Sequence, residues 1–104
     1  MKTPLILLVD DYPHATIGGG ERHVLRLACA CRDWGFRVGI VCAVGSGLEA
    51  HARSEGFEVM PLRIGAGMPG SQRRLARLFG ETSPDVVHAH GFLAIVSAAP
   101  AAKR

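Results

Sequence analysis

No apolar run in this chain of 104 residues approaches the roughly 18 residues that a membrane-spanning helix needs. The apolar run near the start, residues 4–9, is too short for the core of a secretory signal peptide and ends at Asp10 and Asp11. We therefore expect a cytoplasmic protein whose membrane contact, if any, is peripheral, at the inner face of the membrane.

Cysteine is scarce as well. The chain has three, Cys29, Cys31 and Cys42, and their spacing matches no metal-binding motif. Cys29 and Cys31 fall in a predicted helix, where positions two apart point in different directions. We expect three reduced, mostly packed thiols and no metal site built on them.

Neither sign of charge dominates, since 12 basic residues face 9 acidic ones and the formal net charge is +3. The excess is spread along the chain, so it argues only weakly for an anionic partner, and we expect no nucleic acid. The length suits a single domain, residues 1–104, which buries about two-thirds of its unfolded surface.

Strand and helix patterns alternate along the chain. Residues 5–9 are continuously apolar, as in a strand buried on both faces of a parallel sheet. Helical spacing follows in residues 20–34, and Gly35 is expected to end that helix. The pattern further predicts strands at 36–43, 57–62 and 86–89, a loop at 64–70 and a last helix from Phe92. It also predicts a helix at 47–55 that ends at Gly56, and a helix at 72–81 that is capped at its start by Ser71.

This alternation predicts an α/β fold, a Rossmann-like doubly wound parallel sheet with strand order 3-2-1-4. Ligands in such sheets bind beyond the carboxyl ends of the strands, where the strand order reverses. In this sequence those ends carry residues 10–20 and 88–91.

The pair Asp10–Asp11 is one candidate for the chemistry. Paired carboxylates after a first strand resemble a phospho-receiver domain, in which they bind Mg²⁺. That chemistry needs a further aspartate at the end of the third strand, where residues 60–63 read MPLR. A receiver-like regulatory domain therefore stays a minor alternative, and both aspartates are expected to shape the loop through Asx-type hydrogen bonds.

The glycine run Gly18, Gly19 and Gly20 is the other candidate. It precedes a helix, whose first amides are unsatisfied and whose dipole favours a phosphate. The run matches neither the dinucleotide fingerprint nor the P-loop, so nicotinamide binding is not expected and a P-loop is excluded. A purely structural turn and a stand-alone phosphate- or nucleotide-binding module remain open.

Three segments together resemble the N-terminal domain of the family 4 glycosyltransferases of GT-B architecture. The first is the glycine-rich loop entering a helix, GGGERHVLRLA at 18–28. The second is the helix, glycine and strand WGFRVGIV at 34–41. The third, SPDVVHAHG at 83–91, is similar to that family's P-D-[IV]-[IV]-H-x-H signature. The resemblance covers essentially the whole chain in the family's order.

The resemblance implies transfer of a sugar, of the hexosyltransferase type, from a nucleotide-sugar donor to an acceptor with retention of configuration. It implies neither a metal nor another cofactor. By position, the implied binding residues for the donor diphosphate are Gly18, Gly19 and Gly20. His90 is the implied catalytic residue beside the donor sugar and phosphate. The implied acceptor-side candidates are Tyr12, His14 and Gly91.

The chain departs from the family in one respect. The family's second domain carries an E-x₇-E motif and basic residues for the nucleotide, and no such glutamate pair is present here. We therefore expect a fragment, the incomplete N-terminal domain of a GT-B enzyme, which is inactive without its partner C-terminal domain.

Two further groups of side chains complete the sequence expectations. We take His88 and His90 to project from opposite faces of their strand, so that a metal held by this pair is not expected. Arg73, Arg74 and Arg77 fall on the outer face of their predicted helix, where they form either a solvated surface or a contact with an anionic membrane.

Overall fold

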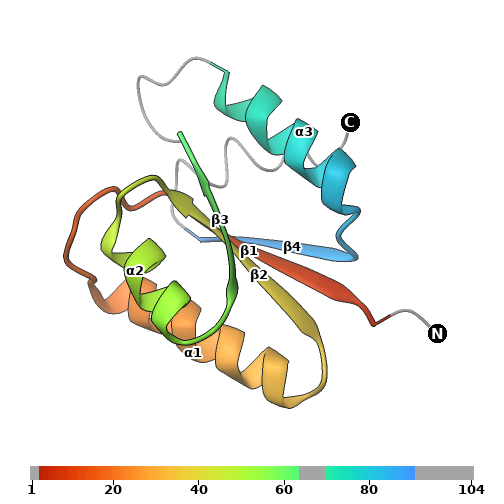
Figure 1. Cartoon of the computed structure of the whole chain (residues 1–104), viewed down its shortest axis with the longest axis horizontal. Helices are drawn as coiled ribbons and strands as arrows, with labels where there is room; N and C mark the ends of the chain where they lie inside the picture. Colours follow the sequence, from red (N-terminus) through yellow and green to blue (C-terminus); the bar gives the residue numbers. More distant parts are fainter. Residues whose placement is uncertain (1–2, 64–69, 91–104) are drawn as a thin grey trace.

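Four parallel strands form one sheet in the order β3-β2-β1-β4, with helices on both faces (Figure 1). The computed structural model describes residues 3–63 and 70–90. Its strands are β1 (Leu5–Asp10), β2 (Arg37–Ala43), β3 (Glu58–Leu62) and β4 (Val86–His90). Its helices are α1 (Gly19–Asp33), α2 (Gly47–Ser54) and α3 (Ser71–Thr82). The predicted α/β fold and strand order are confirmed, while residues 64–69 of the predicted loop, Gly91 and the helix predicted from Phe92 lie outside the described residues.

Strand β1 lies at the centre of the sheet between β2 and β4. Side chains alternate along a strand, so its apolar residues supply both faces. Leu7 and Val9 belong to the core cluster that includes residues of α3, whereas Leu8 belongs to the cluster that includes residues of α1 and α2. The same alternation directs Asp10 toward the face that α1 covers.

The core is therefore divided into two layers, one on each face of the sheet (Figure 1). The layer under α1 and α2 consists of Leu8, Val24, Ala28, Val38, Ile40, Cys42, Leu48, Ala52 and Phe57. The layer under α3 consists of Leu5, Leu7, Val9, Val41, Leu75 and Phe79. Full burial of a large apolar side chain stabilises a fold by about 1.5–3 kcal/mol, so both layers hold the sheet to its helices.

Glycines end two of the helices as predicted. Gly35 after α1 and Gly56 after α2 have φ of 92° and 82°, a left-handed conformation that costs glycine little. The expectation for the start of α3 is wrong: Gly70, at φ 86°, is the N-cap, and Ser71 is the first residue of the helix. A glycine here gives the chain its turn, and no side-chain hydrogen bond caps this helix.

Asp85 joins the start of β1 to the start of β4. Its carboxylate Oδ2 accepts a hydrogen bond from the Leu5 amide at 2.7 Å, and its own amide donates to the Leu5 carbonyl at 2.9 Å. This clamp fixes the register of the two strands, in which Asp10 pairs with His90 at the carboxyl end.

The loop between β1 and α1 is held against the start of α2. The amide of Gly47 donates to the His14 carbonyl at 2.8 Å. A Cβ at Gly47 would overlap the backbone carbonyl of Ala15, so only glycine lets the two segments approach this closely. The loop that leads into α1 is thereby anchored at its middle.

Within residues 3–63 and 70–90, no helix combines the length and the apolar character that crossing a membrane requires.

Candidate functional site

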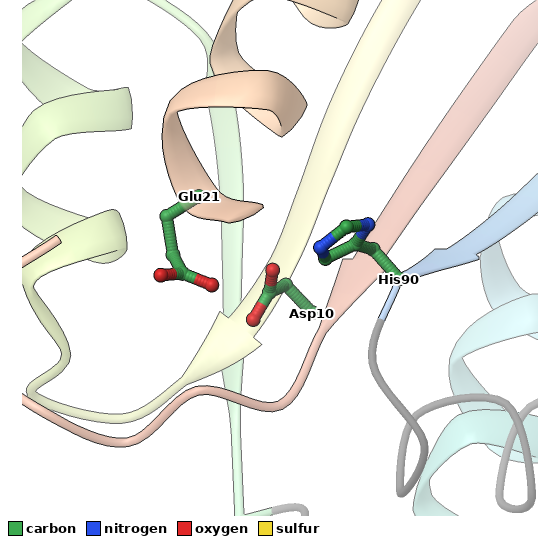
Figure 2. A group of neighbouring side chains, drawn as sticks. All are labelled: Asp10, Glu21 and His90. Atoms are coloured by element: carbon green, nitrogen blue, oxygen red, sulfur yellow. The ribbon is translucent and has the colours of Figure 1, made fainter. Parts of the chain in front are cut away.

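The carboxyl ends of β1 and β4 meet beside the amino end of α1. Asp10 and His90 are register partners at the last paired position of these strands. Helix α1 begins at Gly19, with Gly18 as its N-cap. The structure thus brings the histidine of β4, from the far end of the sequence, beside the acidic end of β1 and the first turn of α1, which carries Glu21 (Figure 2).

Asp10 is buried, with 1% of its surface exposed. Its Oδ1 accepts a hydrogen bond from the Tyr12 amide at 2.8 Å, which is the Asx-type turn predicted from the sequence. Its Oδ2 has no hydrogen-bond partner among the described residues. Burial raises the pKa of this carboxyl to about 6; the Tyr12 amide opposes the rise and the nearby Glu21 adds to it.

Glu21 is also buried, at 5% exposure, on the first turn of α1. Its Oε1 accepts a hydrogen bond from the Gly18 amide at 3.0 Å. This contact is the glutamate half of a capping box, and the other half is missing because Gly18 has no side chain. The bond ties the conformation of the glycine run to a carboxylate that faces the site.

His90 is half-buried against the first turn of α1. A Cβ at Gly20 would lie 2.6 Å from His90 Nε2, so the imidazole occupies the space that any other residue at position 20 would fill. The ring of His23 lies 6.1 Å from that of His90, tilted by 41°. Gly20 therefore leaves room for the histidine ring at this position.

The three glycines have different surroundings. Gly18 is the N-cap in an extended conformation, and Gly20 lies against His90. Gly19 is exposed, and a Cβ there would meet nothing within 4 Å. Because the first amides of a helix have no intrahelical acceptor, Gly19 is the place where a ligand reaches the helix terminus without hindrance.

Asp10, Glu21 and His90 converge as one cluster. One ligating atom from each of the three lies within 4.8 Å of the others (Figure 2). Sequence reasoning missed Glu21 altogether and assigned Asp10 only to loop shape. The available signal was the position of Glu21, three residues after the N-cap, where a glutamate turns back toward the start of its helix.

The acceptor-side candidates Tyr12 and His14 lie together on the loop after β1. Their ring centroids are 4.8 Å apart in an edge-on arrangement. His14 is exposed and Tyr12 is half-buried, and the Tyr12 amide donates to the Asp10 carboxylate. Gly91 lies outside the described residues.

The expectation that His88 and His90 project from opposite faces is wrong. Side chains two positions apart in a strand share a face. His88 pairs with Leu8 and His90 with Asp10, and Leu8 packs in the layer under α1. His88 is exposed and is not part of the cluster that His90 joins.

The remaining candidates lie away from this site. Arg73, Arg74 and Arg77 are all exposed on α3, on the opposite face of the sheet. Arg77 pairs with Glu81 one turn later, and Arg74 donates to the Arg63 carbonyl. Their contact with a membrane stays a prediction.

The cysteines Cys29, Cys31 and Cys42 are free thiols. Burial raises the pKa of the Cys42 thiol to about 11, which keeps it protonated and unreactive at neutral pH.

Comparison with known proteins identifies one family whose sequence model matches this chain. The sequence model of the family described as Glycosyltransferase Family 4 matches residues 17–104, which is most of the chain. No curated protein matches it.

Two solved structures share the fold. A glycosyltransferase from Rickettsia africae ESF-5 superposes on 99% of the chain with a TM-score of 0.78 and 21% sequence identity. MurG from Acinetobacter baumannii superposes on 96% with a TM-score of 0.74 and 13% identity. The chain spans only 27% and 32% of those two chains, respectively.

Proposed function

The chain belongs to Glycosyltransferase Family 4, and from that premise we propose that it is the N-terminal, acceptor-side domain of a retaining glycosyltransferase. The enzyme moves a sugar from a nucleotide-sugar donor to an acceptor. A second domain supplies most of the nucleotide contacts, and residues 1–104 alone are inactive. The small share of the neighbouring structures that this chain spans supports the need for a second domain.

The observation that carries the proposal is the open position of Gly19, one residue before the glycine that lies against His90. Gly19 is exposed at the amino end of α1, and a Cβ at this position would have no neighbouring atom within 4 Å. An anion at that point meets unsatisfied backbone amides and the positive end of the helix dipole. The donor diphosphate lies there, against Gly18, Gly19 and Gly20, with its sugar end toward β4.

This placement meets the electrostatic need of the reaction. As the bond between the sugar carbon and the diphosphate oxygen breaks, negative charge grows on the leaving diphosphate. The helix amides stabilise that charge, and His90 donates an N–H to the phosphate or to the sugar from the end of β4. The Gly20 contact keeps the imidazole beside the helix terminus.

The acceptor enters from the side of the loop that carries Tyr12 and His14. The Gly47 amide anchors the backbone of this loop at the His14 carbonyl, which holds the segment that carries the aromatic pair. A rigid aromatic surface beside a sugar-transfer site is suited to a ring or an apolar acceptor group.

The test compares two histidines of one strand in the complete reading frame that contains this chain. Release of nucleoside diphosphate from a panel of nucleotide-sugars is measured for the unaltered enzyme, His90→Ala and His88→Ala. We expect His90→Ala to lower turnover by about 100-fold or more, because a positioned donor to a developing charge contributes that much. His88 is exposed outside the cluster, so His88→Ala should retain near-normal turnover. Equal turnover of the two variants would refute the assignment of His90.

A further inference from the structure

Asp10 and Glu21 bring two carboxyl groups together in a buried place. Their exposed fractions are 1% and 5%, and they come from different elements, β1 and α1. One oxygen of each lies within 4.8 Å of the other, and Figure 2 shows the two groups side by side. No ion pair between described residues includes either carboxyl. Two ionised carboxylates in this arrangement repel each other and lose hydration without compensation from a paired cation.

The oxygens of Asp10 indicate how this repulsion is relieved. Asp10 Oδ1 accepts the Tyr12 amide, but Oδ2 is buried and accepts no hydrogen bond from any described residue. A buried polar atom without a partner is uncommon in folded proteins. A proton on Oδ2 turns that oxygen into a donor, for which the Glu21 carboxylate is the acceptor. Burial, the charge of Glu21 and this hydrogen bond all raise the pKa of Asp10, to about 6.

The other titratable groups around Asp10 come from three elements. His90 of β4 opposes the rise in the Asp10 pKa, and His23 of α1 lies beside that histidine, with 6.1 Å between the ring centroids. Strand β2 contributes the Cys42 thiol, whose pKa is raised by burial to about 11, so that it is uncharged at neutral pH. Glu21 is therefore the anionic partner that favours a proton on Asp10, and His90 is the group that competes with it.

We propose that Asp10 and Glu21 share one proton, and that this hydrogen-bonded pair positions the glycine run at the end of β1. The proton resides on Asp10 Oδ2 and is donated to Glu21, which in turn accepts the Gly18 amide at 3.0 Å. A continuous series of hydrogen bonds then runs from the Tyr12 amide through both side chains to the N-cap of α1. Both are positioning residues, because they act on a ligand at Gly19 through the helix terminus.

The shared proton couples donor binding to pH, a consequence that rests on the proposed function. The pair carries one negative charge when it shares a proton and two when it does not. An anionic diphosphate at Gly19 therefore favours the protonated pair and binds with uptake of a proton. As pH rises above about 6 the pair loses its proton, the repulsion grows and donor binding weakens.

The pair itself is tested by following the carboxyl ¹³C NMR signals of the 104-residue chain against pH. The Asp10 signal should titrate with a midpoint of about 6, and the Glu21 signal should move at the same pH because it shares the proton. Glu21→Gln should weaken proton binding by Asp10 about 10-fold. Glu81→Gln, an exposed site on α3, should leave it unchanged. An Asp10 midpoint near 3.8, or one that Glu21→Gln does not lower, would overturn the proposal.

The coupling is tested by the KM for the nucleotide-sugar in the complete enzyme. Between about pH 5.5 and about pH 7.5 this KM should rise about 5-fold. Asp10→Asn keeps a donor toward Glu21 and a single negative charge, so it should have the lower KM at both pH values, whereas loss of a merely structural carboxyl would raise KM or leave it unchanged.

A rise in KM that survives Asp10→Asn would belong to a histidine and would overturn the coupling. Absence of transfer by the complete enzyme would count against the proposed function, while the carboxyl pair stands or falls with the NMR titration.

Discussion

Gly20→Ala separates the role of the glycine run in holding His90 from its role in forming a helix. A Cβ at position 20 lies 2.6 Å from His90 Nε2, whereas ordinary contacts of this kind begin at 3.4 Å. The imidazole must therefore retreat by about 0.8 Å. Gly19→Ala is the matched control, because it makes the same change one residue earlier and its Cβ meets nothing within 4 Å.

The magnitudes follow from these contacts. Alanine favours a helix over glycine by up to about 1 kcal/mol, so Gly19→Ala should raise the free energy of unfolding by about 0.5–1 kcal/mol. In Gly20→Ala the same gain is offset by displacement of the His90 ring, which is the end of a side chain and can rotate away at a cost of about 0.5–1 kcal/mol. We expect the second variant to be less stable than the first by about 0.5–1 kcal/mol, with the larger effect on the position of the His90 ring.

The assay is urea unfolding of both variants, with the imidazole NMR signals of His90 followed in parallel. Gly20→Ala should shift those signals, and Gly19→Ala should leave them in place. Equal stability of the two variants, together with unshifted His90 signals in Gly20→Ala, would refute the claim that Gly20 makes room for the histidine.

Three further substitutions test two backbone contacts near the site and the buried carboxyl group of Asp10. Gly47→Ala should lower the free energy of unfolding by about 2–3 kcal/mol in urea titrations, because its Cβ overlaps the Ala15 backbone, which cannot rotate away. Asp85→Ala should cost about 1–2 kcal/mol in the same assay, since the Leu5 amide loses its 2.7 Å acceptor. Asp10→Asn should flatten the pH dependence of stability. The folded pKa of Asp10 is raised to about 6 from 3.8, so its contribution is complete below about pH 4 and is lost as pH rises toward about 6. That loss amounts to at most about 3 kcal/mol.

Each of these predictions has its own control and its own contrary result. Gly80→Ala, in a helix with nothing near its Cβ, should be neutral or stabilising, and a loss equal to that of Gly47→Ala would contradict the steric argument. Asp33→Ala, an exposed aspartate at the end of α1, should cost less than Asp85→Ala. An unaltered slope between pH 4 and 6 in Asp10→Asn would mean that Asp10 is not the group responsible for it.

The architecture could be predicted from the sequence because the burial of apolar side chains determines it. The continuous apolar run of β1 requires cover on both faces, and the glycines after α1 and α2 have the positive φ that ends a helix. Each strand differs from expectation by one residue, and the difference matters: β1 extends to Asp10 and β4 to His90. These added residues are the register pair at the site.

The site was only partly predictable. Treating the aspartates and the glycines as competing candidates was a mistake, because Glu21 links them: it bonds to Gly18 and lies beside Asp10. Period and composition identify the face on which a residue lies, but the convergence of three side chains depends on rotamers and on strand register, which no local pattern specifies. The capping position of Glu21 was a local signal that the sequence reasoning did not use.

The measurement that decides the function is sugar transfer by the complete reading frame carrying Gly19→Leu, against Gly80→Leu as control. Both glycines lie in helices with nothing within 4 Å of a Cβ, so both variants should fold. We predict that Gly19→Leu abolishes release of nucleoside diphosphate, because leucine fills the space assigned to the donor diphosphate, while Gly80→Leu retains it. Normal turnover in a folded Gly19→Leu enzyme would contradict the placement of the donor at the start of α1.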